Sequence, residues 1–136
     1  MGINEKEIEK IKEYLKEKLS PYLIILFGSA VKGYMREDSD VDIAFLSDKE
    51  LNSYEVFLIA QGLADLLGRD VDLVDLKKAS TVFQVQVIST GKVIFCSDKT
   101  KRMVFEMTAL KKYARLNEER ECILEKIKER GSIYGK

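Results

Sequence analysis

Apolar residues recur at helical spacing near the start of the chain and then run together in short blocks. The helical stretch predicts an amphipathic helix over 5–19, with lysine and glutamate on its other face. Pro21 ends that pattern, and the block 22–27 that follows is apolar without alternation. Such a block is typical of a strand that is covered on both faces, in the middle of a sheet.

Three further blocks predict strands over 40–46, 70–75 and 92–96. Between the first two, residues 50–67 carry apolar positions at helical spacing, and Gly68 stands where a helix end with positive φ is expected. After Gly28, the segment 29–34 has room for only one or two helical turns.

One segment in the second half of the chain has an ambiguous secondary structure. Residues 80–89 favour a strand by their β-branched content, yet three of their apolar residues also fit a helical stripe. From 98 to about 130 the pattern is helical, and Leu116-Asn117 is interpreted as a break between two helices. The last residues, 131–136, are expected to be frayed.

The order helix, strand, short helix, strand, helix, strand predicts an α/β or α+β fold, and 136 residues are typical of one domain spanning 1–136. Lys plus Arg equals Asp plus Glu at 23 each, which argues against a generic nucleic-acid binder. The chain has no histidine, so zinc fingers and Ser-His or Cys-His nucleophile pairs are excluded. Without an apolar leader or membrane span, a cytoplasmic protein is expected.

The first candidate for chemistry is the Gly28-Ser29 turn after the buried strand. Glycine at a strand-to-helix turn lets backbone approach a ligand closely. The free N–H groups and the dipole of a following helix suit an anion, and a serine hydroxyl adds a donor for a phosphate oxygen. Taken alone, the pair is better explained as a helix cap after a strand.

Asp40 and Asp42 open the next strand, and their side chains point to the same face because they are two residues apart. Two ionised carboxylates side by side repel each other unless a cation lies between them. Mg²⁺ is the expected cation, since it prefers oxygen ligands and leaves positions open for phosphates. Together with the glycine turn, the pair indicates phosphoryl or nucleotidyl transfer.

A two-metal site of this kind usually needs a third carboxylate. The strand 70–75 offers Asp70 and Asp72 on one face and Asp75 on the other, where Asp75 is placed to cap the following turn. Asp72 is our choice because it stands mid-strand between apolar neighbours, where an unused charge is costly. Asp70 is the second choice.

The spacing of Gly28-Ser29 and Asp40-x-Asp42, with Ser39 before the first aspartate and Asp72 in a later apolar strand, resembles the signature of the DNA polymerase β-like nucleotidyltransferase superfamily. The short chain with only a helical tail, from Arg102 on, is similar to the minimal nucleotidyltransferase (MNT) antitoxins. These antitoxins pair with HEPN-domain ribonuclease toxins.

The resemblance implies a small mixed sheet flanked by helices, with residues 80–89 helical. It implies Mg²⁺-dependent transfer of AMP from ATP to a tyrosine of the cognate HEPN toxin, with one or two ions held by Asp40, Asp42 and Asp72. Gly28, Ser29 and Lys32 are then the nucleotide-binding residues. Family members often carry arginine at the position of Lys32, and lysine lacks the two-pronged contact that arginine makes with phosphate.

Two other functions stay open on the sequence. The acceptor hydroxyl could belong to a small molecule such as an antibiotic, although no residues are left for a second domain to bind it. A binding-only antitoxin would not need the three carboxylates. A nucleic-acid polymerase is disfavoured by the zero net charge.

Overall fold

The computed structural model describes residues 3–28 and 40–133, with side chains up to residue 117. The elements follow the order α1 (Glu5–Leu19), β1 (Pro21–Phe27), β2 (Val41–Ser47), α3 (Ser53–Leu67), β3 (Val71–Asp75), the short 3₁₀ turn η1 (Leu76–Lys78), α4 (Thr81–Thr90), β4 (Lys92–Cys96) and α5 (Lys99–Ile133). The predicted helix at 29–34 lies outside the described residues.

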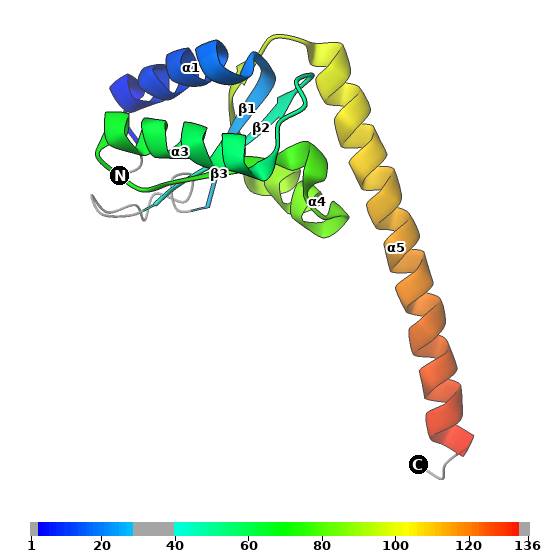
Figure 1. Cartoon of the computed structure of the whole chain (residues 1–136). Coiled ribbons are helices and arrows are strands. Elements are labelled where there is room, and N and C mark those ends of the chain that lie inside the picture. Colours follow the sequence, from blue (N-terminus) through cyan, green and yellow to red (C-terminus); the bar gives the residue numbers. More distant parts are fainter. Residues whose placement is uncertain (1–2, 29–39, 134–136) are drawn as a thin grey trace.

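The four described strands form one mixed sheet in the order β3-β2-β1-β4. Strand β2 runs parallel to β3, whereas β1 is antiparallel to both β2 and β4. Helices α1 and α3 cover one face of the sheet, and α4 lies on the other face beside the start of α5 (Figure 1). The rest of α5 extends away from the sheet. These observations confirm the mixed α/β fold with flanking helices.

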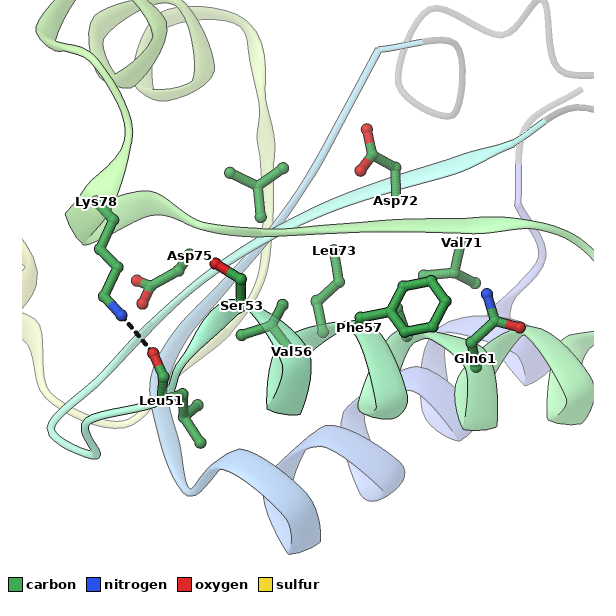
Figure 2. Close-up of a pocket in the computed structure, with 12 residues that line it drawn as sticks. Leu51, Ser53, Val56, Phe57, Gln61, Val71, Asp72, Leu73, Asp75 and Lys78 are labelled. Carbon is green, nitrogen blue, oxygen red and sulfur yellow. Dashed lines mark hydrogen bonds between the residues drawn. The ribbon is translucent and has the colours of Figure 1, made fainter.

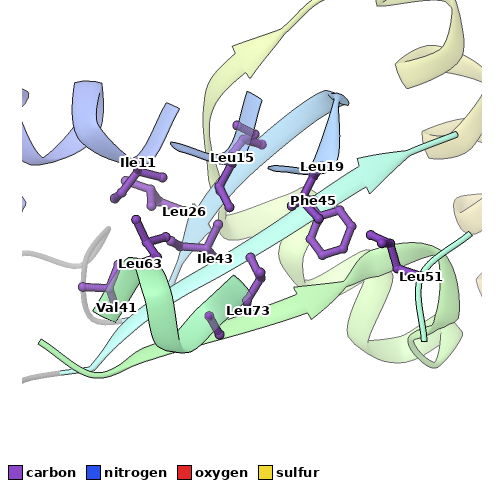
Figure 3. Packing of buried hydrophobic residues seen from close by; sticks show 12 residues of the cluster. Ile11, Leu15, Leu19, Leu26, Val41, Ile43, Phe45, Leu51, Leu63 and Leu73 are labelled. Atoms are coloured by element: carbon purple, nitrogen blue, oxygen red, sulfur yellow. The ribbon is translucent and has the colours of Figure 1, made fainter. Parts of the chain in front are cut away.

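The sheet has an apolar core on each face, which explains why the central strands do not alternate. Under α1 and α3, residues such as Leu15, Ile43 and Phe45 are buried (Figure 3). On the α4 side, Ile25 and Ala44 are buried in a second cluster. Successive side chains of a strand point to opposite faces, so both β1 and β2 must be apolar throughout.

Residues 80–89 are helical, as the family resemblance implies and against their strand propensity. The Ser80 side chain accepts a hydrogen bond from Phe83 N–H at 3.2 Å, which caps the start of α4. Buried Gln84 donates from Nε2 to the Leu76 carbonyl at 2.9 Å. Tertiary contacts on the Gln84 and Val87 side of the helix therefore override the preference of the β-branched residues.

The predicted break at Leu116-Asn117 is wrong, because α5 is one continuous helix from Lys99 to Ile133. Neither residue type forbids helical backbone, and the segment 99–130 contains no proline or glycine to interrupt it. The helix also runs past Gly131, where fraying was expected, and residues 134–136 lie outside the described part. Within that part, no helix is both long and apolar enough to span a bilayer.

Gly91 joins α4 to β4 where the backbone passes close to β1. A Cβ at this position would overlap Ile25 Cγ2 and lie 2.5 Å from the Val87 carbonyl oxygen. We expect Gly91→Ala to lower the free energy of unfolding by about 1–3 kcal/mol, as overpacked cores do. Thermal unfolding measures this, with Ser89→Ala on the exposed side of α4 as the control. Equal melting temperatures for the two variants would contradict the close approach.

Candidate active site

Strand pairing brings the predicted site residues to one end of the sheet. In the β1–β2 ladder Phe27 lies opposite Asp42, so Gly28, the next residue, comes beside that carboxylate. In the parallel β2–β3 ladder Asp42 lies opposite Asp72. Two residues 30 positions apart in the chain are thereby direct neighbours.

The carboxylates share the α4 side of the sheet. Asp42 alternates with Ile43, which is buried under α1 and α3, and therefore points to the opposite face. Residues opposite each other in a parallel ladder point the same way, so Asp72 joins it. Figure 2 shows Asp72 and Leu73 on opposite sides of β3. Asp40, two residues before Asp42, is exposed just outside β2.

Gly28 has two reasons to be glycine. Its φ is +70°, which other residues rarely adopt. A Cβ there would also overlap Asp42 Oδ2, and its distance to Asp42 Cγ would be 3.2 Å. The turn after β1 thus brings the Gly28 backbone directly against the Asp42 carboxylate. The predicted approach of this backbone to a ligand stays a prediction.

The half-buried Asp42 carboxyl is the electrostatic centre of the group. Burial raises its pKa, and the negative charges of Asp72 and then Asp40 raise it further. Asp70, the second choice for the third carboxylate, does not contribute to this shift. Its backbone carbonyl accepts a hydrogen bond from Val41 N–H at 2.9 Å, and its side chain is exposed.

Asp75 has the structural role that its position suggested. Its side chain accepts a hydrogen bond from Lys77 N–H at 3.2 Å and caps η1. The geometry therefore brings together Asp40, Asp42 and Asp72, and leaves Asp70 and Asp75 apart from them.

The carboxylate set suits a hard divalent cation by its chemistry. It offers only oxygen donors, and the repulsion that raises the pKa of Asp42 is what a cation would relieve. Among the described residues, no three acidic or thiol side chains are close enough together to form a metal site. Asp40 and Asp72 are both exposed to solvent.

Two predicted nucleotide-binding residues, Ser29 and Lys32, lie outside the described residues. Sequence reasoning missed one neighbour of the site. Phe83 of α4 packs edge-on against Phe27, with ring centroids 5.5 Å apart and an interplanar angle of 86°. This contact fixes the end of β1 from which Gly28 departs. The position of Phe83 could not be predicted from the residues alone, because their pattern left 80–89 ambiguous between a helix and a strand.

Comparison with known proteins agrees with this geometry. Residues 9–100 match the family model described as polymerase beta nucleotidyltransferase. The chain belongs to this family. The match spans β1, β2 and β3, and so contains every residue of the carboxylate group.

Relatives of this nucleotidyltransferase carry more specific descriptions. It is 37% identical over 125 residues to the protein adenylyltransferase MntA of Shewanella oneidensis, covering 92% of this chain and 88% of that protein. It also resembles a crystal structure of a toxin–antitoxin with AMP-PNP, with a TM-score of 0.79 and 36% identity. That likeness covers 88% of this chain and 97% of the other.

A second similar structure is a tri-AMPylated Shewanella oneidensis HEPN toxin in complex with an MNT antitoxin. The TM-score is 0.75 at 32% identity, over 92% of this chain and 98% of the matched chain. The resemblance to the MNT antitoxins, drawn from the short chain and its helical tail, is thereby confirmed, as is the superfamily resemblance drawn from the glycine turn and the aspartates.

Proposed function

We propose that this nucleotidyltransferase transfers AMP from ATP to a tyrosine hydroxyl of a HEPN-domain toxin and so acts as the antitoxin of that toxin. The observation that carries the proposal is the pairing of Asp42 with Asp72, directly against the bare backbone of Gly28. The transfer of AMP is supported by the 37% identity to a protein adenylyltransferase over nearly the whole chain. The HEPN toxin as acceptor is supported by the likeness to the MNT antitoxin in complex with a tri-AMPylated HEPN toxin.

Asp40, Asp42 and Asp72 would hold one or two Mg²⁺ ions in this proposal. Such an ion neutralises phosphate charge and lowers the pKa of a hydroxyl that it binds. Gly28 lets the triphosphate approach the backbone, and Ser29 and Lys32 are proposed to donate to its oxygens.

The acceptor hydroxyl attacks the α-phosphorus in line with the leaving group. A new bond forms between that oxygen and phosphorus, the bond to the β-phosphate oxygen breaks, and pyrophosphate departs. Asp72 is exposed on the outermost described strand of the sheet, and it is the proposed acceptor of the hydroxyl proton. Because the proposed reaction uses ATP and acts on a ribonuclease toxin, a cytoplasmic location is part of the proposal.

A small-molecule acceptor is the second enzymatic candidate, and a binding-only antitoxin is the non-enzymatic one. The described chain consists of the sheet, its covering helices and the long α5, without a separate acceptor domain. The clustered carboxylates also raise the pKa of Asp42, a cost that an antitoxin acting by binding alone has no reason to retain.

The test is the intact mass of a cognate HEPN toxin after incubation with this chain, ATP and Mg²⁺. We expect the toxin mass to rise by one or more AMP units, and its ribonuclease activity to fall with the modified fraction. The same mixture without ATP is the control. An inhibited toxin of unchanged mass would establish the binding-only function and refute the transfer.

A further inference from the structure

A groove of about 400 Å³ lies between helix α3 and the outer edge of strand β3. Val56, Phe57 and Gln61 line it from the helix, and Val71 and Leu73 line it from the strand (Figure 2). Its wall is largely apolar and open to solvent. The polar groups of Ser53, Asp75 and Lys78 stand at one end, where the Lys78 ammonium donates to the Leu51 carbonyl.

The strand that lines this groove is the last one of the described sheet, so one of its edges has no strand beside it. In a parallel ladder, alternate residues turn their backbone groups toward the neighbouring strand. The Asp70 carbonyl accepts from Val41 N–H, which assigns the even-numbered positions to β2. The N–H and C=O groups of Val71 and Leu73 therefore point outward, along the groove.

One apolar side chain of the groove, Phe57, is largely exposed, whereas the others are buried or half-buried. Phe57 is 56% exposed although it is among the largest apolar side chains of α3. An added strand would cover Phe57 while it paired with the outward groups of β3, the arrangement by which extended peptides bind free sheet edges. A free edge flanked by apolar side chains fits an extended polypeptide better than a folded helix.

The groove and the carboxylate group meet at Asp72, which lies on the strand that lines the groove while its side chain points to the α4 side of the sheet (Figure 2). A strand paired with β3 places its side chains alternately on the two faces of the sheet. The side chain opposite Asp72 on the α4 side then has its Cβ about 5 Å from that of Asp72. A residue in that position presents its hydroxyl to the carboxylates.

We propose that the protein acceptor of this enzyme docks as an extended segment on the free edge of β3, above Phe57, with its modified residue opposite Asp72. This inference rests on the proposed function and names the acceptor site that the function leaves unassigned. The nucleotide approaches from the Gly28 side of Asp42, and the acceptor approaches from the β3 side. The two substrates thus meet at the paired carboxylates.

The experiment compares Phe57→Glu with Leu58→Glu in AMP transfer to the full-length toxin. Leu58 is the next residue on α3 and is 49% exposed, but it does not line the groove, so the two variants differ only in position. We expect Phe57→Glu to raise the KM for the toxin about tenfold, as loss of a central interface contact does. The KM of Phe57→Glu for ATP should stay within about twofold of wild type. For Leu58→Glu, the KM for the toxin and the KM for ATP should both stay within the same range.

Hydrogen exchange of the toxin-bound chain, measured without ATP, tests strand pairing directly. We expect the amides of Val71 and Leu73 to exchange more slowly in the complex, and those of α3 at Leu58 to be unchanged. Unaltered exchange at Val71 and Leu73, or equal KM values for the two variants, would overturn the docking site. A wild-type chain that docks on β3 but transfers no AMP would instead refute the proposed function.

Discussion

Replacing Asp42 with asparagine is expected to lower the rate of AMP transfer by about 1000-fold or more, because several kcal/mol of charge stabilisation are lost with a central cation ligand. Asp42 lies between Gly28 and Asp72, so no neighbouring side chain can take its place. The measurement is the single-turnover rate of toxin modification with ATP and Mg²⁺. Transfer at the wild-type rate would contradict the assignment of the site.

The same substitution is expected to stabilise the protein in the absence of divalent metal. The pKa of Asp42 is raised in the folded chain, so its ionised form destabilises the fold, and stability rises as the pH falls through that pKa. Asparagine removes the charge, and the melting temperature at neutral pH should therefore increase. Addition of Mg²⁺ should raise the melting temperature of the wild type and leave that of Asp42→Asn unchanged.

Asp70→Asn is the matched control for the third carboxylate. Asp70 directly precedes β3, and Asp72 lies within it. Of these two carboxylates, only Asp72 contributes to the raised pKa of Asp42. Asp72→Asn should reduce transfer at least about 100-fold, whereas Asp70→Asn should remain within about twofold of wild type. If Asp70→Asn reduced transfer more than Asp72→Asn did, the third cation ligand would be Asp70.

The sheet and the carboxylates were open to prediction because their signals are local. Uninterrupted apolar blocks predict strands that are buried on both faces, and the lengths of these blocks predict those of β1 and β2. The Asp-x-Asp pattern predicts that Asp40 and Asp42 point to the same face, because side chains alternate along a strand. The choice of Asp72 agrees with the geometry, although for a different reason from the one that led to it.

Asp72 was selected as a charge too costly to bury, yet its side chain is exposed on an edge strand. Strand order depends on long-range pairing, and no local pattern reveals that β3 ends the sheet. The same limit applies to α4, whose helical state depends on contacts of Gln84 with Leu76 and of Phe83 with Phe27. The groove beside β3 has no sequence signature, because two separate elements form it.

The position of this groove bears on how a short chain selects a large substrate. The described residues build a sheet with the Gly28 turn on one side of Asp42 and the outer edge of β3 on the other. A second domain is unnecessary if the acceptor itself supplies the missing strand. Specificity then depends on the toxin adopting an extended segment, which restricts modification to proteins that can pair with β3.

Replacing Gly28 with alanine is the second change for which we expect a large effect, a loss of transfer of about 100-fold or more. The new methyl group would occupy the position of Asp42 Oδ2 and displace that carboxylate from Asp72. Misplacement of a reacting or ligating group by about 1 Å is enough for a loss of this size. The KM for ATP should also rise, since the methyl group blocks the approach of phosphate to the backbone.

Gly68→Ala is a closely matched control, because Gly68 has a φ of +69° against +70° for Gly28. Nothing lies within 4 Å of a Cβ at Gly68, so that variant carries the conformational cost alone. Both substitutions should lower the free energy of unfolding by about 1 kcal/mol through the strained backbone. Only Gly28→Ala should lose activity at a temperature where both are folded. Equal activity in the two variants would show that the contact between Gly28 and Asp42 does not position the carboxylate for transfer.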